Sequence, residues 1–431
     1  MKRSIVWFKT DLRLEDNETL VKAVHYSDEV LPVYVLEDSL FETTFFGTNK
    51  IGNFRYQFLC ESLKDLDANL REIGSGLLVV RGKAEIELPK LVRQFNINVI
   101  YSKKEVAPEE RSLDQKVEKA VWKDLCLFEQ FSTSTLYHAL DLPFPVKKIP
   151  DVFTSFRKKI EKETSVRGVF PKPKVIKSPT IHSLFLPDYS IVGLTKVEED
   201  NRSAVPFKGG ETEALKRLNY YLFEEKLISN YKNTRNELIG KDYSSKLSLW
   251  LSNGCISPRM IYSKVKQYEE EIESNDSTYW LIFELVWRDY FRFMVKKHRN
   301  SYFLKSGIKD KGDYISNNFD QSVFDKWKSG NTGNLFIDAN MKELKLSGYM
   351  SNRGRQIVAS YFCNELEQDW RYGAAYFEEQ LMDYDVCSNW GNWSYIAGVG
   401  NDPRGKRIFN IEKQVKDYDP LHRFQNLWLE K

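Results

Sequence analysis

The hydrophobic pattern of this chain changes its period near residue 209, and that change limits what the chain can fold into. Before it, helical spacing over 18–26 and 56–73 alternates with short apolar runs. These strand-like runs are SIVWF (4–8), EVLPVYVL (29–36), GLLVV (76–80) and NVIYS (98–102). Such alternation predicts a parallel sheet with helices on its faces, a doubly wound α/β domain. No GxGxxG follows the first strand, so the dinucleotide fingerprint is absent there.

After Gly209 the strand signals nearly vanish. Apolar residues recur at spacings of three and four over 211–227, 256–273, 277–298 and 355–366. We therefore expect an all-helical C-terminal domain. The expected division is an α/β domain at 1–130, a connector at 131–206 and a helical domain at 207–431.

Residues 141–180 differ in composition from both domains. They hold six of the 14 prolines, and ten Lys or Arg against four Asp or Glu. This composition favours a solvated linker laid over a surface. The alternative is that its basic residues also touch a polyanion.

Charge and cysteine usage exclude several classes of protein. The net charge is +3, so any basic surface must be local. Five scattered cysteines without a CxxC pair, and five unclustered histidines, argue for a reducing compartment and against disulfides or a metal site. No apolar run approaches 18 residues, and the N-terminal one is too short for a signal peptide. We expect a cytoplasmic protein without a membrane span.

Aromatic residues make up 14% of the chain, and eight of the ten tryptophans follow Gly209. Extra rings can fill a core or stack on flat ligands. Four segments of the helical domain combine rings, cations and glycine: YSSKLSLWLSNGC (243–255), FELVWRDYFRF (283–293), GYMSNRGRQ (348–356) and DYDVCSNWGNWSYIAGVGND (383–402).

Each segment alone also has an ordinary interpretation. The serines around Lys246 suit phosphate oxygens, or a simple helix N-cap. On a helix, Glu284, Trp287, Arg288 and Phe291 share one face, which could bind a flat polar group or hold a Glu–Arg pair. Together the four segments indicate a cofactor with both a flat ring and phosphates. FAD is the natural candidate, because the Gly-rich turn typical of nicotinamide cofactors is missing.

At these residues the chain resembles the photolyase/cryptochrome family, and within it the cryptochrome-DASH branch. Ordered motifs carry the resemblance along the whole chain: VWFKTDLRLEDNETL (6–20), IPDVFTSFRKKIE (149–161), FKGGETEAL (207–215), YKNTRNELIGKDYSSKLS (231–248), WLIFELVWRDYFRF (280–293), NTGNLFIDANMKEL (331–344), DWRYGAAYF (369–377) and the 348–356 and 383–402 segments. The resemblance implies an antenna domain joined by a long connector to a helical FAD domain.

The resemblance also implies roles for particular residues around FAD. Those expected near the phosphates and the ribityl chain are Tyr231, Ser244, Ser245, Lys246, Leu247 and Ser248. Arg355 and Asp383 match a pair beside the isoalloxazine, and Asp385 matches an acid near the edge of that ring. Asn389 falls on the residue that faces flavin N5, where an amide would tune the ring's reduced states.

A chain of tryptophans is the next implication. Trp393 matches the ring nearest the flavin, Trp370 the middle ring and Trp327 the surface ring. The alternative is that all three are core residues. Trp390 has no counterpart in this chain of rings, and we interpret it as packing.

For the substrate, the resemblance implies light-driven repair of cyclobutane pyrimidine dimers in DNA. Glu284 matches the carboxylate that binds the dimer, Trp287 and Asn352 match other dimer contacts, and Arg235 and Arg353 match DNA contacts. Tyr395 and Gln356 replace a tryptophan and a methionine of the duplex-acting photolyases. A smaller, more polar pocket gains less stacking energy to offset base flipping, so we expect single-stranded DNA to be preferred.

The segment matching Ser351–Gln356 lacks the paired histidines of (6–4) photolyases, so that activity is not expected. A folate antenna, methenyltetrahydrofolate, is expected between the domains, with Glu109 or Glu110 as a contact. The alternative for these glutamates is a helix start after Pro108.

We expect a monomer. The competing functions are a blue-light receptor that binds FAD and nucleic acid without turnover, and a generic flavin oxidoreductase.

Overall fold

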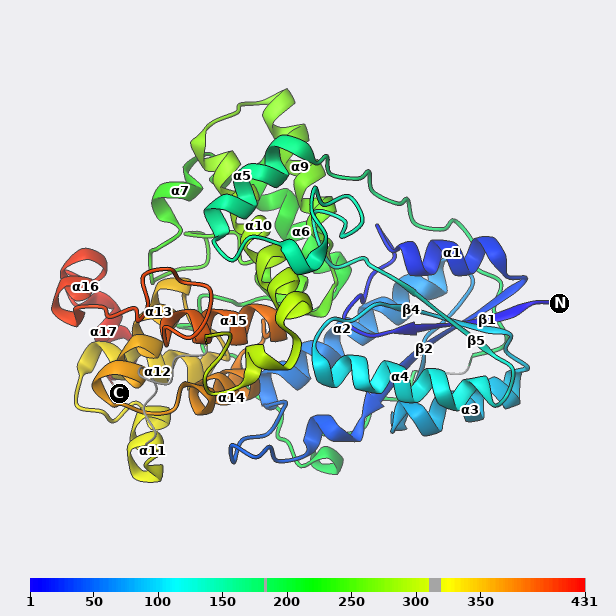
Figure 1. The fold of residues 1–431 in the computed structure, drawn as a ribbon, viewed down its shortest axis with the longest axis horizontal. Helices are drawn as coiled ribbons and strands as arrows, with labels where there is room; N and C mark the ends of the chain where they lie inside the picture. Colours follow the sequence, from blue (N-terminus) through cyan, green and yellow to red (C-terminus); the bar gives the residue numbers. More distant parts are fainter. Residues whose placement is uncertain (182–183, 310–318, 431) are drawn as a thin grey trace.

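The computed structural model describes residues 1–181, 184–309 and 319–430. Its N-terminal part holds five parallel strands in the order β3-β2-β1-β4-β5 (Figure 1). These strands are β1 (Arg3–Phe8), β2 (Glu29–Glu37), β3 (Leu78–Gly82), β4 (Val99–Lys103) and β5 (Leu127–Phe131). The expected α/β fold is confirmed. The fifth strand was not predicted, because LFEQF is an edge strand whose side chains are only partly buried.

Helices cover both faces of this sheet, as a parallel sheet requires. They are α1 (Glu18–Tyr26), α2 (Asn53–Glu72), α3 (Ala84–Phe95) and α4 (Pro108–Trp122). Leu88 of α3 and Val121 of α4 pack with Ile5 on one face, whereas Leu20 of α1 and Leu63 of α2 share the core of the other face. Helix α4 begins at Pro108, which confirms the predicted helix start.

The connector is more than a solvated linker. Its helix α5 (Phe153–Glu163) packs against α10 (Asp276–His298) and buries Phe153, Phe156 and Ile160. The chain then returns over the α/β domain, where the Ile176 amide donates to the Ile73 carbonyl at 2.8 Å. The prediction of a simple linker is therefore wrong for this stretch, because three large apolar side chains in helical spacing have a core to enter.

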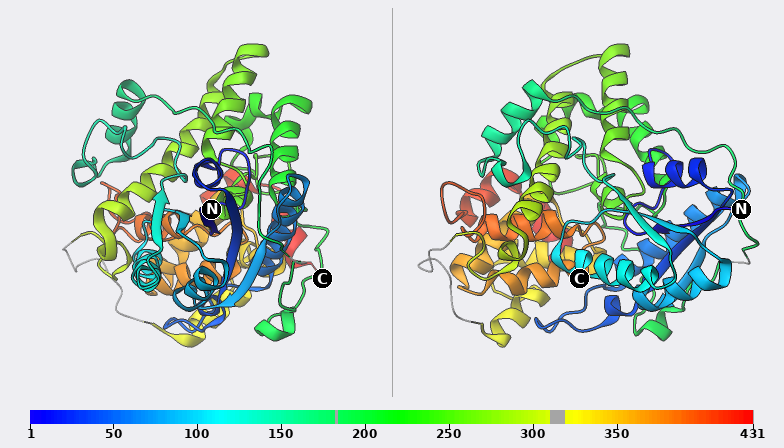
Figure 2. Two further views of the ribbon diagram at one scale, coloured as in Figure 1. Left: turned by 90° about the vertical axis from the view of Figure 1, so that its right-hand side faces the viewer. Right: turned by 45° about the vertical axis from the view of Figure 1, so that its right-hand side comes forward.

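The rest of the chain is helical, as predicted, and forms a second body beside the sheet domain (Figures 1 and 2). Besides α10, its helices are α6 (Glu211–Asn219), α7 (Tyr231–Thr234), α8 (Ser248–Asn253), α9 (Pro258–Glu271), α11 (Gln321–Ser329), α12 (Leu335–Ser347), α13 (Asn352–Ser360), α14 (Trp370–Gln380), α15 (Val386–Ile396), α16 (Ile411–Tyr418) and α17 (Arg423–Leu429). Helices α6 and α13 end earlier than predicted, and each continues as one π-helical turn, Tyr220–Glu224 and Tyr361–Glu365.

Helix α10 joins the two bodies. It starts with a capping box, in which the Asn275 side chain accepts from the Thr278 amide and the Thr278 hydroxyl accepts from the Asn275 amide. Its Arg292 donates to Glu105 of the α/β domain at 2.9 Å. Its Asp289 accepts from the amides of Leu136 and Tyr137 at 2.9 and 2.8 Å. One helix thus fixes the sheet domain and the connector to the helical domain.

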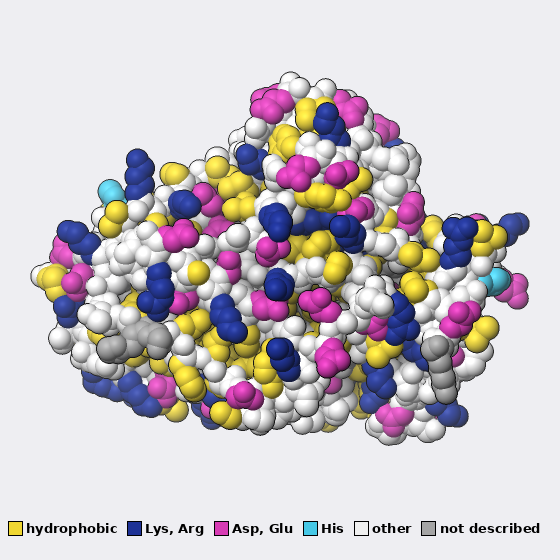
Figure 3. All heavy atoms as spheres, turned by 180° about the vertical axis from the view of Figure 1, so that it is seen from behind, with side chains coloured by type: hydrophobic (Ala, Val, Ile, Leu, Met, Phe, Trp, Pro, Cys, Tyr) yellow, Lys and Arg dark blue, Asp and Glu magenta, His cyan; other side chains and the backbone are white. Residues whose placement is uncertain are grey.

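Two kinds of feature are absent from the part of the chain that the structure describes. No helix in that part of the chain is long and apolar enough to cross a membrane. Nor do the described His, Cys, Asp and Glu side chains gather in a group that could hold a metal ion. On the face in Figure 3, cationic and anionic side chains are interspersed rather than gathered in one field, in keeping with the net charge of +3.

Candidate functional site

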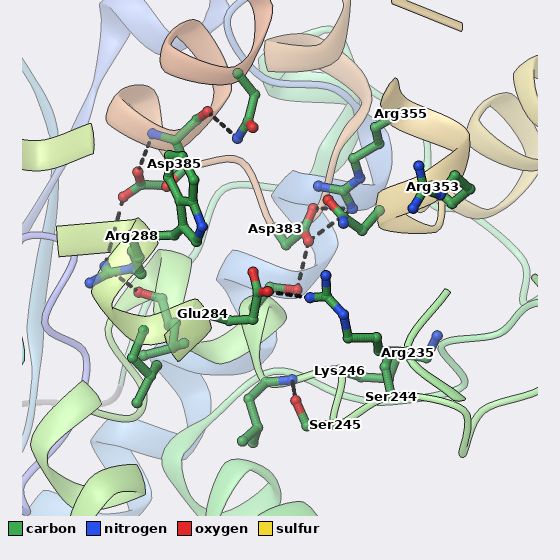
Figure 4. A pocket seen from close by; sticks show the side chains of 18 of the residues that line it. Arg235, Ser244, Ser245, Lys246, Glu284, Arg288, Arg353, Arg355, Asp383 and Asp385 are labelled. Carbon is green, nitrogen blue, oxygen red and sulfur yellow. Dashed lines mark hydrogen bonds and ion pairs between the residues drawn. The ribbon is translucent and has the colours of Figure 1, made fainter. Parts of the chain in front are cut away.

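A cavity of about 520 Å³, here called the central cavity, opens between α7, α8, α10, α13 and α15. Its walls contain every FAD and substrate residue expected above except Asn389. These are Tyr231, Arg235, Ser244, Ser245, Lys246, Leu247, Ser248, Glu284, Trp287, Asn352, Arg353, Arg355, Gln356, Asp383, Asp385 and Tyr395. Figure 4 shows acids and arginines from four separate segments facing one another across it.

One end of the cavity is formed by the loop before α8. Lys246 is buried there with a φ of +59°, and its ammonium donates to the Tyr349 hydroxyl at 3.2 Å and lies 3.1 Å from the centroid of the Tyr243 ring. Burial holds the pKa of Lys246 well below its usual value. Helix α8 is not capped by a serine, since its N-cap residue is Leu247 and makes no side-chain cap bond. The simple N-cap interpretation is therefore wrong.

A buried acid lies in the surroundings of this lysine. Burial raises the pKa of Glu343, on α12, to about 8, although Lys246 and Arg355 act in the opposite direction. Its Oε2 is buried and makes no hydrogen bond within the described structure.

The wall next to the loop before α8 carries a fixed ion pair. Arg355 Nη2 lies 2.9 Å from both carboxylate oxygens of Asp383, and Arg355 Nε donates to the Met350 carbonyl at 2.8 Å. The Ser248 hydroxyl donates to Asp383 Oδ2 at 2.7 Å. Burial alone would lower the pKa of Arg355, but Asp383 and Tyr349 raise it above its usual value. The pair therefore stays charged and keeps one geometry.

Asp385 occupies the N-cap of α15 and accepts from the Ser388 amide at 2.8 Å. Burial opposes its charge, but Arg288, 3.7 Å away, and Arg292 lower the pKa of Asp385 below its usual value. Arg288 also donates to the Ser134 and Leu251 carbonyls. The expected Glu–Arg pair within this helix is therefore not formed.

Glu284 instead pairs with Arg235, which follows α7. Burial raises the pKa of Glu284, although Arg235 acts in the opposite direction. The neighbouring Trp287 stacks on Phe153 of the connector, with centroids 3.6 Å apart and an angle of 11° between the rings. Tyr395 meets Trp287 edge to face at 6.0 Å. A carboxylate and two rings thus share one part of the wall.

Asn389 and Trp393 line a smaller cavity of about 90 Å³ that shares Arg355, Asp383 and Asp385 with the central one. The Asn389 amide donates to the Ala374 carbonyl at 2.9 Å, which fixes the orientation of its side chain. Trp393 lies flat against Gly373, where an added Cβ would come within 2.2 Å of the indole.

The expected order of the tryptophans needs correction. Trp327 is 0% exposed and meets Trp393 edge to face at 6.1 Å, so it is not a surface ring. Helix α11 is short and amphipathic, and Trp327 lies on its buried face beside Phe324. Trp370 is also buried and donates to the Lys305 carbonyl at 3.1 Å. Its ring contacts Trp390 edge to face at 5.7 Å.

A second cavity, about 890 Å³ and here called the interdomain cavity, lies between the α/β domain and residues 253–390 of the helical domain. Glu109 and Glu110 both line it. The Glu109 side chain is largely exposed and pairs with Lys50. Burial, reinforced by Glu105, raises the pKa of Glu110 to about 8, and its Oε2 makes no hydrogen bond to a described residue. Glu110 is the better placed of the two to bind a ligand.

Sequence reasoning missed several residues of the central cavity. Arg407 donates to the Tyr395 hydroxyl at 3.1 Å and forms an ion pair with the buried Asp402. Phe409, Tyr243 and Tyr349 are further lining residues. The basic run RGKRIF (404–409), which follows the Trp-rich segment, was the available signal for Arg407.

With this geometry established, known proteins provide the comparison. The sequence profile of DNA photolyase matches residues 4–176, and that of the FAD binding domain of DNA photolyase matches residues 280–431. The chain belongs to the photolyase/cryptochrome family. Cryptochrome DASH of Danio rerio is 45% identical over 99% of this chain and 82% of its own length. Cryptochrome DASH of Synechocystis is also 45% identical, over 99% of this chain and 87% of its own length.

Solved structures of the family agree with the fold. A Synechocystis cryptochrome has a TM-score of 0.95 at 44% identity and covers 100% of this chain, with 89% of its own chain matched. A class III photolyase from Agrobacterium tumefaciens has a TM-score of 0.80 at 25% identity, with 100% and 86% covered. The family's FAD-binding domain and the cavity agree, because the residues present suit FAD: hydroxyls and a lysine for phosphates, and a fixed Arg–Asp pair beside them.

Proposed function

We propose that this protein uses blue light and FAD to repair cyclobutane pyrimidine dimers, mainly in single-stranded DNA. The observation that carries the proposal is that Glu284, Trp287 and Asn352 share one cavity with the Arg355–Asp383 pair. A carboxylate suited to binding the dimer and an ion pair suited to the flavin thus lie in the same cavity. Its volume, about 520 Å³, is ordinary for a ligand pocket.

The roles of the residues follow from their contacts. Lys246 and the serines around it would bind the phosphates and the ribityl chain of FAD, with Tyr231 and Leu247 lining the same end. Arg355 and Asp383 would hold the ring system, Asp385 its edge and Asn389 its N5 side. When bound, FAD supplies the light absorption and the electron that opens the cyclobutane ring.

Glu284 would hydrogen-bond the dimer bases. Before the dimer binds, the ion pair with Arg235 holds the Glu284 carboxylate in position. Because Glu284 is desolvated, its hydrogen bond to the bases is stronger than it would be in water. The dimer must leave the base stack to reach this group. Arg235, Arg353 and the newly identified Arg407 are the cations of the cavity wall that could contact backbone phosphates.

The preference for single strands rests on Tyr395 and Gln356. Tyr395 offers a smaller ring than tryptophan, and its hydroxyl is already engaged by Arg407. Gln356 accepts from Arg353 at 3.1 Å, which makes this wall polar. Stacking of the flipped bases on this smaller ring offsets less of the few kcal/mol that flipping them out of a duplex costs. A single strand avoids most of that cost.

Electrons would reach the flavin through Trp393 and Trp370, with Trp327 as a further ring beside Trp393. A methenyltetrahydrofolate antenna would occupy the interdomain cavity, with Glu110 as its polar contact.

Under this proposal residues 1–130 form the antenna domain, 131–206 the connector and 207–431 the FAD- and DNA-binding domain. We also propose a monomeric, cytoplasmic protein, although a tomato relative is named chloroplastic/mitochondrial. Size-exclusion chromatography and cell fractionation test these two points.

The decisive experiment illuminates the reduced protein with dimer-containing oligonucleotides, single-stranded and duplex, after an absorbance spectrum has established bound flavin. We expect light-dependent loss of dimers, faster in the single strand. Equal rates would contradict the strand preference alone. If flavin is bound but dimers are lost from neither substrate, the repair function is contradicted and the receptor function is favoured. A protein purified without flavin bands would overturn the whole proposal.

A further inference from the structure

Trp390 is the one indole of the 383–402 segment to which sequence reasoning gave no chemical role. It lies on α15, three residues before Trp393, so the two indoles are neighbours along one side of the helix. Its ring meets Trp370 edge to face at 5.7 Å. Trp390 is 7% exposed and lines the interdomain cavity. It therefore contacts the buried Trp370 and lines a cavity at the same time.

The ring that was expected to reach solvent does not. Trp327 is 0% exposed, and its described ring contacts are Trp393, Tyr376 and three phenylalanines, Phe324, Phe362 and Phe377. A phenyl ring gives up an electron far less readily than an indole. The hydroxyl of Tyr376 donates to the Lys328 carbonyl, and oxidation of a phenol also requires loss of its proton. Apart from Trp393, none of these neighbouring rings is therefore readily oxidised by a radical cation at Trp327.

We propose that Trp390 is the outer redox relay of this protein, and that electrons enter at the interdomain cavity. The inference rests on the proposed flavin photochemistry. With FAD bound, light would draw one electron from Trp393, and Trp390 would refill Trp393 directly or through Trp370. The Trp390 radical cation would then take one electron from a soluble thiol in the cavity when no antenna occupies it. Two such cycles oxidise two thiols, which release two protons and pair as a disulfide. Electrons and protons balance without any other reactant.

The surroundings of Trp390 suit this role. Its indole Nε1 donates to the Tyr384 hydroxyl at 3.2 Å, and its ring is packed by Phe303 and Phe46, with centroids at 5.4 and 6.1 Å. These contacts fix the orientation of the ring. Phe303, Phe46 and Tyr384 also line the interdomain cavity, so a donor that enters it comes close to the indole.

The test compares Trp390→Phe with Trp428→Phe. Trp428 is also buried, 2% exposed, in the same apolar cluster, but it lies under Arg202, 4.5 Å from its ring, and has no described ring contact with Trp370 or Trp393. We expect Trp390→Phe to slow thiol-dependent photoreduction at least tenfold and Trp428→Phe to leave it unchanged. Irradiation without a thiol should leave the main oxidised indole at Trp390, located by peptide mass spectrometry.

A measurement on the unaltered protein covers the case in which Trp390→Phe misfolds. A small thiol should support photoreduction at least tenfold faster than the same thiol attached to a polymer too large for the cavity. Equal rates with both donors, or oxidation mainly at Trp327, would overturn the proposal. If Trp390→Phe behaves like wild type while Trp393→Phe blocks photoreduction, the relay fails and the proposed function stands. If the wild type binds flavin but shows no photoreduction, the electron supply within the proposed function fails as well.

Discussion

The two cavities of this protein are built in different ways. In the central cavity three acids are already paired: Asp383 with Arg355, Glu284 with Arg235, and Asp385 with Arg288. The interdomain cavity is larger and is formed where two domains meet, and the buried Oε2 of Glu110 has no partner there among the described residues. The first is preorganised for charge chemistry, whereas the second has a wall of mixed aromatic and charged side chains with one open acceptor on Glu110. The proposed binding of an antenna in the interdomain cavity thus depends on other contacts than the proposed chemistry in the central cavity.

The largest expected effect comes from breaking the Arg355–Asp383 pair. Arg355→Ala leaves a buried carboxylate uncompensated, which costs about 3 to 5 kcal/mol. We expect FAD affinity to fall by about two to three orders of magnitude, measured as the ratio of flavin to protein absorbance. Lys50→Ala, which breaks the exposed pair at the interdomain cavity, should leave that ratio unchanged. Equal flavin loss in both variants would show that the cavities are not independent.

The next effect separates substrate from cofactor within the central cavity. Glu284→Gln keeps the size of the side chain but removes the charge, so we expect repair to slow about 10- to 100-fold with FAD content unchanged. Glu110→Gln is the matched change in the interdomain cavity and should leave repair unchanged when the flavin is excited directly. A normal repair rate in Glu284→Gln would remove that residue from the mechanism.

A smaller effect concerns the choice of strand. Tyr395→Trp restores a larger ring opposite Trp287, and stacking of one base is worth about 1 to 3 kcal/mol. We expect duplex repair to rise several-fold relative to single-strand repair, in competition assays with both substrates. Tyr376→Trp, at a buried position outside the central cavity, controls for the added indole. An unchanged ratio would mean that Tyr395 does not set the preference.

The smallest effect is on the pH dependence of stability. The pKa of Glu343 is raised to about 8, above its unfolded value of about 4.3, so the folded protein holds this proton more tightly. The stability it contributes is full below about pH 4 and is lost as the pH rises toward 8. Glu343→Gln should flatten the fall in Tm between pH 5.5 and 8 by about 2 °C. Glu110→Gln should act in the same direction, and no change in either slope would contradict the raised pKa values.

Much of the site could be predicted because the motifs are local. The face carrying Glu284, Trp287 and Arg288 follows from helical spacing alone, and the structure places all three in one cavity. The partner of Glu284 could not be predicted in this way. Sequence spacing suggested Arg288, four residues away, whereas the structure selects Arg235, 49 residues away. Only the packing of α7 beside α10 brings that arginine within reach.

Burial was the other quantity that the sequence did not supply. Trp327 matches a motif, but a motif does not say which side of a short helix faces the core. The stack of Phe153 on Trp287 likewise joins the connector to α10 over more than 130 residues. The edge strand β5 has weak alternation because solvent reaches part of each side chain. Long-range packing decides all three.

Helix α10 presents Glu284, Trp287 and Arg288 to the central cavity and extends Arg292 to Glu105, beside the interdomain cavity. Each residue of an α-helix turns the chain by about 100°. Inserting or deleting a single residue between Arg288 and Arg292 would therefore swing one set of side chains away from its partners while the other stayed in place. Both cavities depend on the register of this one helix. Substitutions in α10 are therefore better tolerated than insertions or deletions.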